Sequence, residues 1–168
     1  MIFAVLDTNV IVSALYAKKE ESMPLRAVKY IYTENVIPVY DYEILKEYDQ
    51  VLRRDKFKFP EDRIKDIIKS IVERGILVKE VLFVDEEGFP DKSDIKFYRV
   101  TMTLKGEGAY LVTGNAKHFP KEEFIVSPRE FVEIVQKDIE EEKARKEKEQ
   151  QDREESLEEK IKRYKAGI

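Results

Sequence analysis

Short apolar runs separated by amphipathic stretches recur along the chain as far as about residue 135. The first run, Ile2–Leu6, is short and rich in β-forming residues, so it predicts a strand buried on both faces of a parallel sheet. Later runs predict four more strands, at 36–40, 76–84, 109–112 and 124–126. Pro38 lies inside the second run and cannot donate a ladder hydrogen bond, so we predict an edge strand or a strand with an irregular middle there.

Between these runs, apolar residues follow helical spacing. Asp41 is a candidate cap for a helix whose core stripe includes Ile44, Tyr48 and Leu52. Another helix begins at Pro60, and Gly75 is predicted to end it as a C-terminal glycine does. The alternation of strands and helices is typical of an α/β fold with a central parallel sheet and helices on both of its faces. Residues 85–93 are acidic and predict a turn-rich loop.

The pattern changes at Lys137, where charged residues begin to dominate. Glutamates precede basic residues by four positions several times, the better orientation for ion pairs on a helix. We predict one compact domain at 1–136 and a long charged helix at 137–168, extending a helix that begins at Pro128. Near the end of this extension there is a thin apolar stripe of Leu157, Ile161, Tyr164 and Ile168. It is either a solvated tail or a helix that docks onto this protein, a second copy or a partner.

Composition narrows the chemistry. The 168 residues include no Cys and a single His, which excludes thiolate and His-rich metal sites, so a metal would be held by oxygen ligands and would be Mg²⁺ or Mn²⁺. A net charge of −4 gives no overall basic footprint for nucleic acid, although an enzyme that holds phosphates through metal ions does not need one. Ile2–Leu6 is too short for a signal or membrane segment, which predicts a cytoplasmic protein with no membrane attachment.

Acidic residues recur where a parallel sheet would gather them. Asp7 directly follows the first strand, where it could also cap a helix; Glu47, or alternatively Glu43, lies on the helix after the second. Asp94 begins the helix before the strand at 109–112, with Asp91 beside it as a loop acid, and Asn115 follows that strand. Like charges gathered at one edge are unfavourable unless a cation neutralises them. The pattern therefore predicts a divalent-metal site that could activate water at a phosphodiester.

The sequence resembles the PIN-domain family, in the branch of toxin components of toxin–antitoxin systems. The resemblance covers about residues 1–135 and rests on VLDTNVIVSAL at 5–15, EILKEYDQVL at 43–52, DKSDIKFY at 91–98, AYLVTGNAKHFP at 109–120 and IVSPREF at 125–131. It implies a three-layer α/β/α sandwich and a single-stranded RNA endonuclease that needs Mg²⁺ or Mn²⁺. It also implies RNA as substrate, with a small antitoxin protein and a second copy of the chain as candidate partners.

The resemblance assigns roles to individual positions. Asp7, Glu47 and Asp94 match the acidic metal-binding residues, and Asn9 matches the polar residue that supports the first Asp. Asn115 stands where many family members have a further Asp, and an amide would hold a second metal more weakly.

Other polar residues keep two interpretations. Thr8 and Thr113 would bind phosphate or cap helices, and His118 is interpreted as a turn residue rather than a general base. The basic residues Arg53, Arg54 and Lys56 would either follow an RNA backbone or complement a helix dipole.

Two rival functions remain. A phosphatase that uses a first-strand Asp needs a second Asp two positions on, where this chain has Asn9. A non-catalytic interaction protein would use the PIN fold as a scaffold and the charged C-terminal helix to bind a partner. A metal-dependent nuclease assay distinguishes the scaffold from the enzyme.

Overall fold

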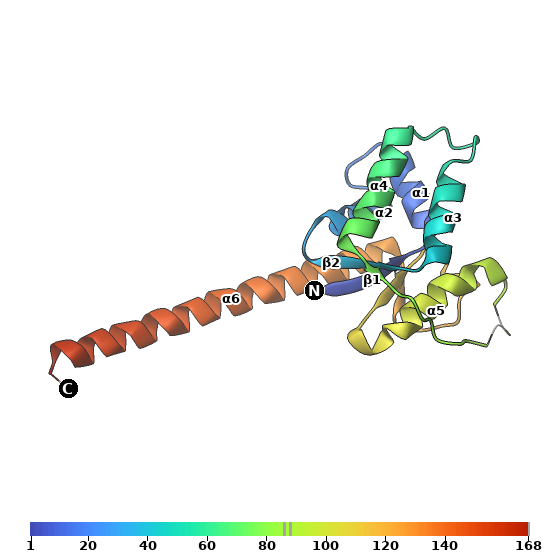
Figure 1. Ribbon diagram of the computed structural model, residues 1–168. Helices are drawn as coiled ribbons and strands as arrows, with labels where there is room; N and C mark the ends of the chain where they lie inside the picture. Colours follow the sequence, from blue (N-terminus) through green and yellow to red (C-terminus); the bar gives the residue numbers. More distant parts are fainter. Residues whose placement is uncertain (86, 88, 168) are drawn as a thin grey trace. The chain divides into compact units, whose positions relative to one another are not determined.

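The computed structural model describes residues 1–85, 87 and 89–167, so Glu86 and Gly88 of the predicted loop lie outside the described residues. The chain divides into two compact units, Met1–Val135 and Gln136–Ile168. Figure 1 traces the chain from β1 to the end of α6. Among the described residues, no helix is long and apolar enough to cross a membrane.

A five-stranded parallel sheet forms the centre of the first unit, as predicted. Its strands are β1 (Ile2–Leu6), β2 (Val36–Tyr40), β3 (Ile76–Leu77), β4 (Tyr110–Val112) and β5 (Ile125–Val126), in the spatial order β3-β2-β1-β4-β5. The middle strand β1 pairs with both neighbours, and Ala4 lies opposite Pro38 on one side and Tyr110 on the other. Ala4 and Val5 are fully buried, which explains the uninterrupted apolar run.

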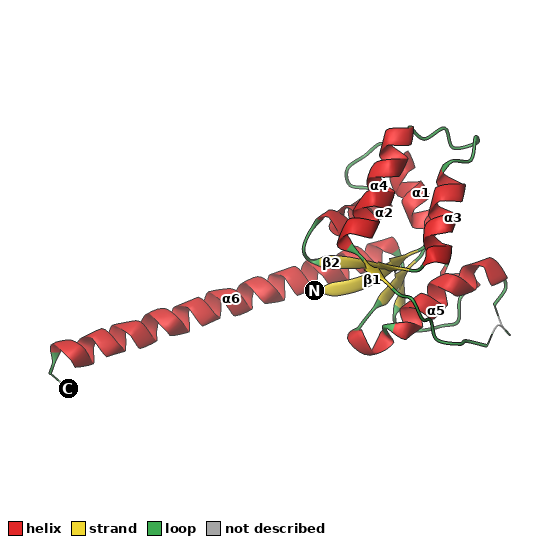
Figure 2. Cartoon of the chain, viewed as in Figure 1, coloured by secondary structure: helices red, strands yellow, loops and turns green. Residues whose placement is uncertain are grey.

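Helices cover both faces of this sheet, which confirms the α/β/α prediction. They are α1 (Thr8–Tyr16), α2 (Met23–Lys29), α3 (Tyr42–Leu52), α4 (Glu61–Arg74), α5 (Ile95–Thr103) and α6 (Pro128–Lys165). Right-handed connections that step from β1 to β2 to β3 place their helices on one face, and the connection that returns from β3 to β4 places its helix on the other. Figure 2 shows this division, with α1 to α4 on one side of the sheet and α5 on the opposite side.

Two strand predictions need correction. Of the two alternatives predicted for 36–40, the edge strand is wrong, because β2 lies between β3 and β1 in the sheet. Pro38 is tolerated there because β3 joins only from Val39 onward, so the proline lies before that ladder begins. The predicted strand at 76–84 is only two residues long, because β2, its pairing partner, ends at Tyr40, opposite Leu77.

Gly75 ends α4 as predicted, but for a different reason from the one expected. Its backbone is extended, with φ −98° and ψ 177°, rather than left-handed. A Cβ atom at this position would lie 2.4 Å from the Ile71 carbonyl oxygen and 2.6 Å from that of Pro38. Glycine is therefore required because the backbones of α4 and β2 approach closely, which lets β3 reach the sheet at once after the helix.

The start of α6 belongs to the first unit. The predicted capping box forms there: the Ser127 amide donates to Glu130 Oε2 at 2.7 Å, and the Glu130 amide donates to Ser127 Oγ at 3.3 Å. Phe131 and Val135 are then fully buried, so the first turns of the helix close the core.

Beyond residue 135 the long helix is a unit of its own. The predicted pair of Glu142 and Lys146 forms at 2.6 Å, and most side chains in this part are exposed. Leu157, Ile161 and Tyr164 are among the exposed large hydrophobic residues of the chain. The helix is therefore held by its own backbone and by ion pairs, each of which contributes only about 0.2–0.5 kcal/mol.

The strand order reverses between β1 and β4, so the connections at these two neighbouring strands run toward opposite sides of the sheet. The connection from β1 leads to β2 on one side, whereas β4, on the other side of β1, is reached from β3. In open α/β sheets, ligands bind at the carboxyl ends of the strands at such a point. Asp7 and Thr113 follow β1 and β4 directly, so both lie at this edge.

Candidate functional site

Asp7 lies at the carboxyl end of β1 and is fixed from three sides. Its backbone amide donates to the Val112 carbonyl at 2.9 Å, which continues the pairing of β1 with β4. Oδ1 accepts from the Asn9 amide at 3.1 Å, so Asp7 does cap α1, the alternative role that the sequence left open. Oδ2 accepts from Thr113 Oγ1 and from Asn9 Nδ2, both at 2.6 Å. Capping therefore uses one oxygen, and the second ties two strand ends together.

Asn9 and Thr113 hold this arrangement in place. Asn9 Oδ1 accepts from the Gly114 amide at 3.0 Å, which links α1 to the segment after β4. Thr113 Oγ1 in turn accepts from the Asn115 amide at 2.9 Å while its hydroxyl donates to Asp7. The polar residues after β4 therefore fold around the Asp7 carboxylate, and Thr113 orients it rather than capping a helix.

The Asp7 carboxyl is an acid in an unfavourable place for negative charge. Only 4% of the residue is exposed. Its pKa is raised from 3.8 to about 6. Burial is the largest cause, the hydrogen bonds from Thr113 and Asn9 oppose it, and the nearby charges of Asp94 and Glu47 add to the rise. An added cation at this point would relieve the charge that the protein leaves uncompensated.

Asp7 lines an open cavity of about 760 Å³ at the edge of the sheet. The structure brings all four predicted catalytic residues to this cavity, since Glu47, Asp94 and Asn115 also line it. Of the predicted supporting residues, Thr8, Asn9, Asp91 and Glu43 line it as well, whereas Thr113 is buried behind Asp7. Residues from α1, α3, α5 and the turn after β4 therefore meet at one place.

Glu47 projects from α3 with both carboxylate oxygens engaged. Oε1 accepts from Thr8 Oγ1 at 2.6 Å, and Oε2 forms an ion pair with Lys96 Nζ at 2.5 Å. Glu43, the alternative acid on the same helix, also lines the cavity but is exposed. Glu47 is thus the α3 carboxylate that is tied to the Asp7 segment, through Thr8.

Sequence reasoning missed Lys96, a cation that lines this acidic cavity and pairs with Glu47. Its side chain is only 14% exposed, and its ammonium group also donates to the Ser93 carbonyl. The signal was a lysine two residues after Asp94, in the first turn of α5, but its direction depends on how α5 packs against α3. Lys96 therefore neutralises part of the carboxylate charge in the structure.

Asp94 has a different partner. Its Oδ2 lies 3.0 Å from Nδ1 of His118. Burial raises the pKa of the Asp94 carboxyl, and the hydrogen bond with His118 opposes that shift. His118 ends the turn Ala116–His118, so it is a turn residue as predicted, but the same turn directs its ring to Asp94.

Asp91 belongs to the local turn that precedes α5. It accepts a hydrogen bond from the Ser93 amide at 2.8 Å and is exposed. The hydrogen bonds from Ser93 lower the pKa of Asp91, in contrast to Asp7 and Asp94. Its interpretation as a solvated turn acid agrees with this geometry, although the residue borders the cavity.

The predicted basic residues separate into two groups. Arg53 forms ion pairs with Asp49, at 2.8 Å, and with Glu61, so it links α3 to α4. Arg54 lines the cavity, and Lys56 lies 4.8 Å from the centroid of the Phe57 ring. Of the three, Arg54 borders the acidic site directly, and Lys56 lies against Phe57, which lines the same cavity.

The donor set fits a hard divalent cation. Five carboxylates line one cavity, those of Asp7, Glu43, Glu47, Asp91 and Asp94, and the lining residues include no thiolate. In addition to burial, the charges of Asp94 and Glu47 help to raise the pKa of Asp7, and those of Asp91 and Glu47 help to raise the pKa of Asp94. As the side chains stand, however, no three His, Cys, Asp or Glu residues among those described are grouped closely enough to hold a metal. Lys96 and His118 engage Glu47 and Asp94, so an ion held by these carboxylates would have to replace those contacts.

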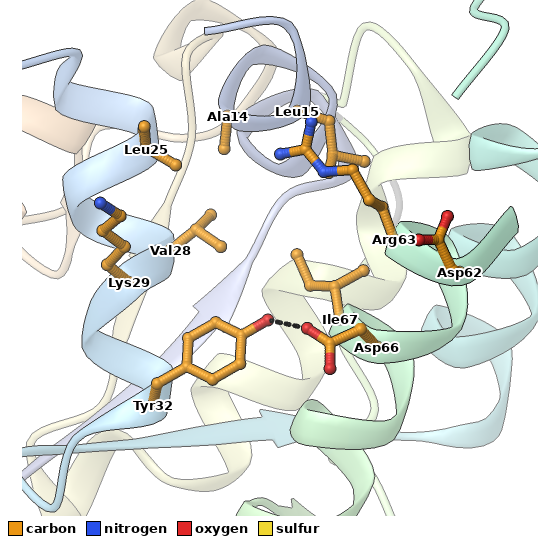
Figure 3. A pocket seen from close by; sticks show the side chains of 10 residues that line it. All are labelled: Ala14, Leu15, Leu25, Val28, Lys29, Tyr32, Asp62, Arg63, Asp66 and Ile67. Atoms are coloured by element: carbon orange, nitrogen blue, oxygen red, sulfur yellow. Dashed lines mark hydrogen bonds between the residues drawn. The ribbon is translucent and has the colours of Figure 1, made fainter. Parts of the chain in front are cut away.

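A second pocket, of about 510 Å³, lies among α1, α2 and α4 and is lined by Ala14, Leu25, Val28 and Ile67 together with polar residues. Figure 3 shows that its tyrosine, Tyr32, points toward Asp66, and the hydroxyl donates to that carboxylate at 3.1 Å. This pocket is away from the strand ends and does not collect the predicted acids. The acidic cavity is therefore the better candidate for chemistry.

Comparison with known proteins agrees with this choice. A family model described as PIN domain matches residues 4–117, which is more than half of the chain and includes Asp7, Glu47, Asp94 and Asn115. No curated protein and no solved structure matches the sequence.

Proposed function

The chain belongs to the PIN-domain family, whose fold is that of metal-dependent nucleases, and on this premise we propose that it is a single-stranded RNA endonuclease that requires Mg²⁺ or Mn²⁺. The observation that carries the proposal is the meeting of Asp7, Glu47 and Asp94 in one cavity at the carboxyl ends of β1 and β4. The preference for RNA and the choice of metal rest on the sequence resemblance. We further propose that it acts in the cytoplasm.

Asp7 and Asp94 would hold the metal, with Glu47 as the third carboxylate. A divalent ion bound there supplies an activated water and neutralises charge on the phosphodiester. Thr113 and Asn9 fix the direction of the Asp7 carboxylate through hydrogen bonds of 2.6 Å each. Asn115 borders the same cavity and would orient a water or a phosphate oxygen rather than add charge.

The positive groups of the cavity have a separate task. Lys96 and Arg54 line it together with the acids, so they would contact the negatively charged backbone of the substrate. Thr8 keeps Glu47 at the wall of the cavity when Lys96 turns to a phosphate, because its hydroxyl engages the other carboxylate oxygen.

We also propose that the protein is the toxin of a toxin–antitoxin pair. Its partners would be RNA, a small antitoxin protein, and a second copy of the chain. This role rests on the sequence resemblance alone.

The test is isothermal titration of Mn²⁺ into the wild type and an Asp7→Asn, Asp94→Asn double variant, followed by cleavage of a generic single-stranded RNA with the same preparations. We expect metal binding and cleavage to be lost together, because the variant removes two of the three carboxylates proposed to hold the metal. Asp62→Asn is the matched control, since this acid lies on α4 at the other pocket and should leave both measurements unchanged. Metal-dependent cleavage that survives in the double variant would exclude the proposed site.

A second function is favoured by one observation. Leu157 and Ile161 are exposed large hydrophobic residues one helical turn apart, with Tyr164 nearly a turn further on. A stripe of this kind on an otherwise charged helix would suit a docking helix in an interaction protein.

Size-exclusion chromatography of the full chain tests this second function. A Leu157→Glu, Ile161→Glu variant should lose an oligomer or a captured partner, whereas Gln151→Glu on the same helix should not. If the wild type and both variants elute identically, with and without a candidate antitoxin protein, the docking function is wrong and the nuclease remains the proposed function.

A further inference from the structure

Three aromatic side chains gather where the loop after α3 meets the end of α1. The rings of Phe57 and Phe59 are parallel, with centroids 5.4 Å apart and an interplanar angle of 10°. Tyr16 packs edge-on against them, with its centroid 4.8 Å from that of Phe59 and 5.9 Å from that of Phe57. Tyr16 is 52% exposed, and both phenylalanines are half-buried. We call these three residues the aromatic cluster.

The aromatic cluster is continuous with the acidic cavity. Phe57 lines that cavity together with Asp7 and Asp94, and so does Arg54. A strand of nucleic acid whose phosphodiester lies at the carboxylates would therefore have the ring of Phe57 beside it. The other rings of the cluster support Phe57, because Phe59 stacks on it and Tyr16 closes the edge.

Positive charge surrounds the same ring. Lys56 Nζ lies 4.8 Å from the centroid of the Phe57 ring. Lys58, which separates the two phenylalanines in the sequence, has a φ of 54°, a left-handed conformation that is unusual for a lysine. The turn at Lys58 is what allows residues 57 and 59 to present parallel rings. A polyanion with flat, stackable groups matches this combination of cations and aromatic faces, whereas an apolar peptide does not require it.

We propose that the aromatic cluster is a stacking subsite for one nucleobase of the single-stranded RNA substrate, with Arg54 and Lys56 on the adjacent phosphates. This inference rests on the proposed function and adds to it the place where the strand is held beside the cleavage point. In the structure, Lys56 stands over the Phe57 ring; in the complex a base takes that position and Lys56 moves to the backbone. Stacking of this kind is tolerant of sequence, because every base has a π-face.

The absence of tryptophan from the chain permits a direct test. In full-length Phe57→Trp, the new residue is the sole indole, and a base stacked on it quenches its fluorescence. Titrations use Ca²⁺ in place of Mn²⁺, with gel analysis to verify that the RNA stays intact. We expect quenching by a short single-stranded RNA but not by an abasic oligonucleotide of equal length and charge. Phe83→Trp is the matched control, since Phe83 is 94% exposed and does not line the cavity, and it should respond to neither.

Binding affinity gives a second measurement on the full chain. By fluorescence anisotropy with the same labelled RNA, Phe57→Leu should bind about tenfold more weakly than the wild type, because leucine keeps an apolar side chain but has no ring to stack on. Phe83→Leu should bind as the wild type does. Loss of affinity in Phe57→Leu for the RNA, but not for the abasic oligonucleotide, would support the subsite.

The outcomes separate this inference from the function on which it rests. If the wild type binds and cleaves RNA while Phe57→Leu binds equally well, or if the abasic oligonucleotide quenches Phe57→Trp as strongly as RNA does, the subsite is wrong and the nuclease stands. If the wild type neither binds RNA nor cleaves it with Mn²⁺, the proposed function fails and the subsite fails with it.

Discussion

At the scale of single residues, Asp7 is the position where folding and chemistry are in conflict. Its hydrogen bonds with Thr113 and Asn9 stabilise the carboxylate, but burial and the neighbouring acids act against the negative charge more strongly. A structural cap would gain nothing from this environment. A carboxylate that binds a cation does gain from this environment, because the bound ion offsets the repulsion between Asp7 and the neighbouring acids.

The raised pKa of Asp7 predicts a pH dependence of stability. The folded protein holds this proton to about pH 6, whereas the unfolded chain releases it near 3.8, so the free energy of unfolding decreases as the pH rises between these values. At neutral pH, metal-free Asp7→Asn should be more stable than the wild type by roughly 2 kcal/mol. Urea denaturation in the presence of a chelator, at mildly acidic and at neutral pH, measures the difference.

The wild type itself provides the control for that experiment. Added Mn²⁺ should stabilise it at neutral pH and should leave Asp7→Asn nearly unchanged, since ligand binding to the folded state shifts the unfolding equilibrium. An Asp7→Asn variant that is less stable than the wild type at neutral pH would contradict the charge conflict described here.

Lys96 gives a second prediction at this scale. Because its ammonium group pairs with Glu47 at 2.5 Å, Lys96→Met removes a positive charge that competes with a metal ion for that carboxylate. We expect the variant to bind Mn²⁺ about tenfold more tightly in isothermal titration. The same variant should bind RNA less well.

Lys46→Met is the matched comparison for Lys96, since Lys46 lines the same cavity from α3. It should alter Mn²⁺ affinity much less if competition at Glu47 is the cause. Equal changes in the two variants would instead indicate a general effect of the electrostatic potential in the cavity.

Much of the candidate site could be predicted from the sequence, because its acids follow strands or begin helices. Asp7 ends an unmistakable buried strand, and strand ends in a parallel sheet share one edge. The contacts of Lys96 and His118 could not be predicted in the same way. Each depends on a side-chain direction set by tertiary packing, and a single lysine or histidine in a charged chain carries no pattern of its own.

At the scale of elements, the strand at Ile76 shows where the reasoning from pattern stops. An apolar run from 76 to 84 indicates extended backbone, but a strand exists only where a neighbour pairs with it, and β2 ends at Tyr40, opposite Leu77. Pro38 led to the opposite error, the prediction of an edge strand where the strand is interior. A proline removes one hydrogen bond of a ladder but does not prevent the rest of the ladder from forming. Pairing partners, rather than composition, decide both cases.

Gly75 supplies the prediction at this scale. Gly75→Ala should lower the free energy of unfolding by about 1–3 kcal/mol, because the new methyl group meets backbone oxygens of α4 and β2 that cannot move independently. Chemical denaturation measures the change. Gly106→Ala is the matched control: a Cβ there meets nothing within 4 Å, and it should be neutral or slightly stabilising.

At the scale of the whole molecule, the two units have different sources of stability. Met1–Val135 contains the sheet, the buried core and the acidic cavity. Gln136–Ile168 has mostly exposed side chains, and none of its described residues belongs to the buried core.

We therefore expect a chain that ends after Val135 to keep its melting temperature, its Mn²⁺ affinity and its RNA cleavage. Thermal denaturation followed by the titration and cleavage assays would compare it with the full chain. Loss of cleavage with intact Mn²⁺ binding would show that the charged helix takes part in holding RNA, which would assign it a role beyond the partner binding proposed above.

The hydrogen bond between Thr113 and Asp7 joins residues that are 106 positions apart in the sequence. During synthesis, the ribosome exposes Asp7 early and Thr113 only after most of the chain has emerged. Until then β4 is missing beside β1, and the carboxylate lacks its orienting hydroxyl. On the proposed function, the nascent chain therefore lacks a complete carboxylate site while its own messenger is still being translated, and a fragment that ends before Thr113 lacks it altogether.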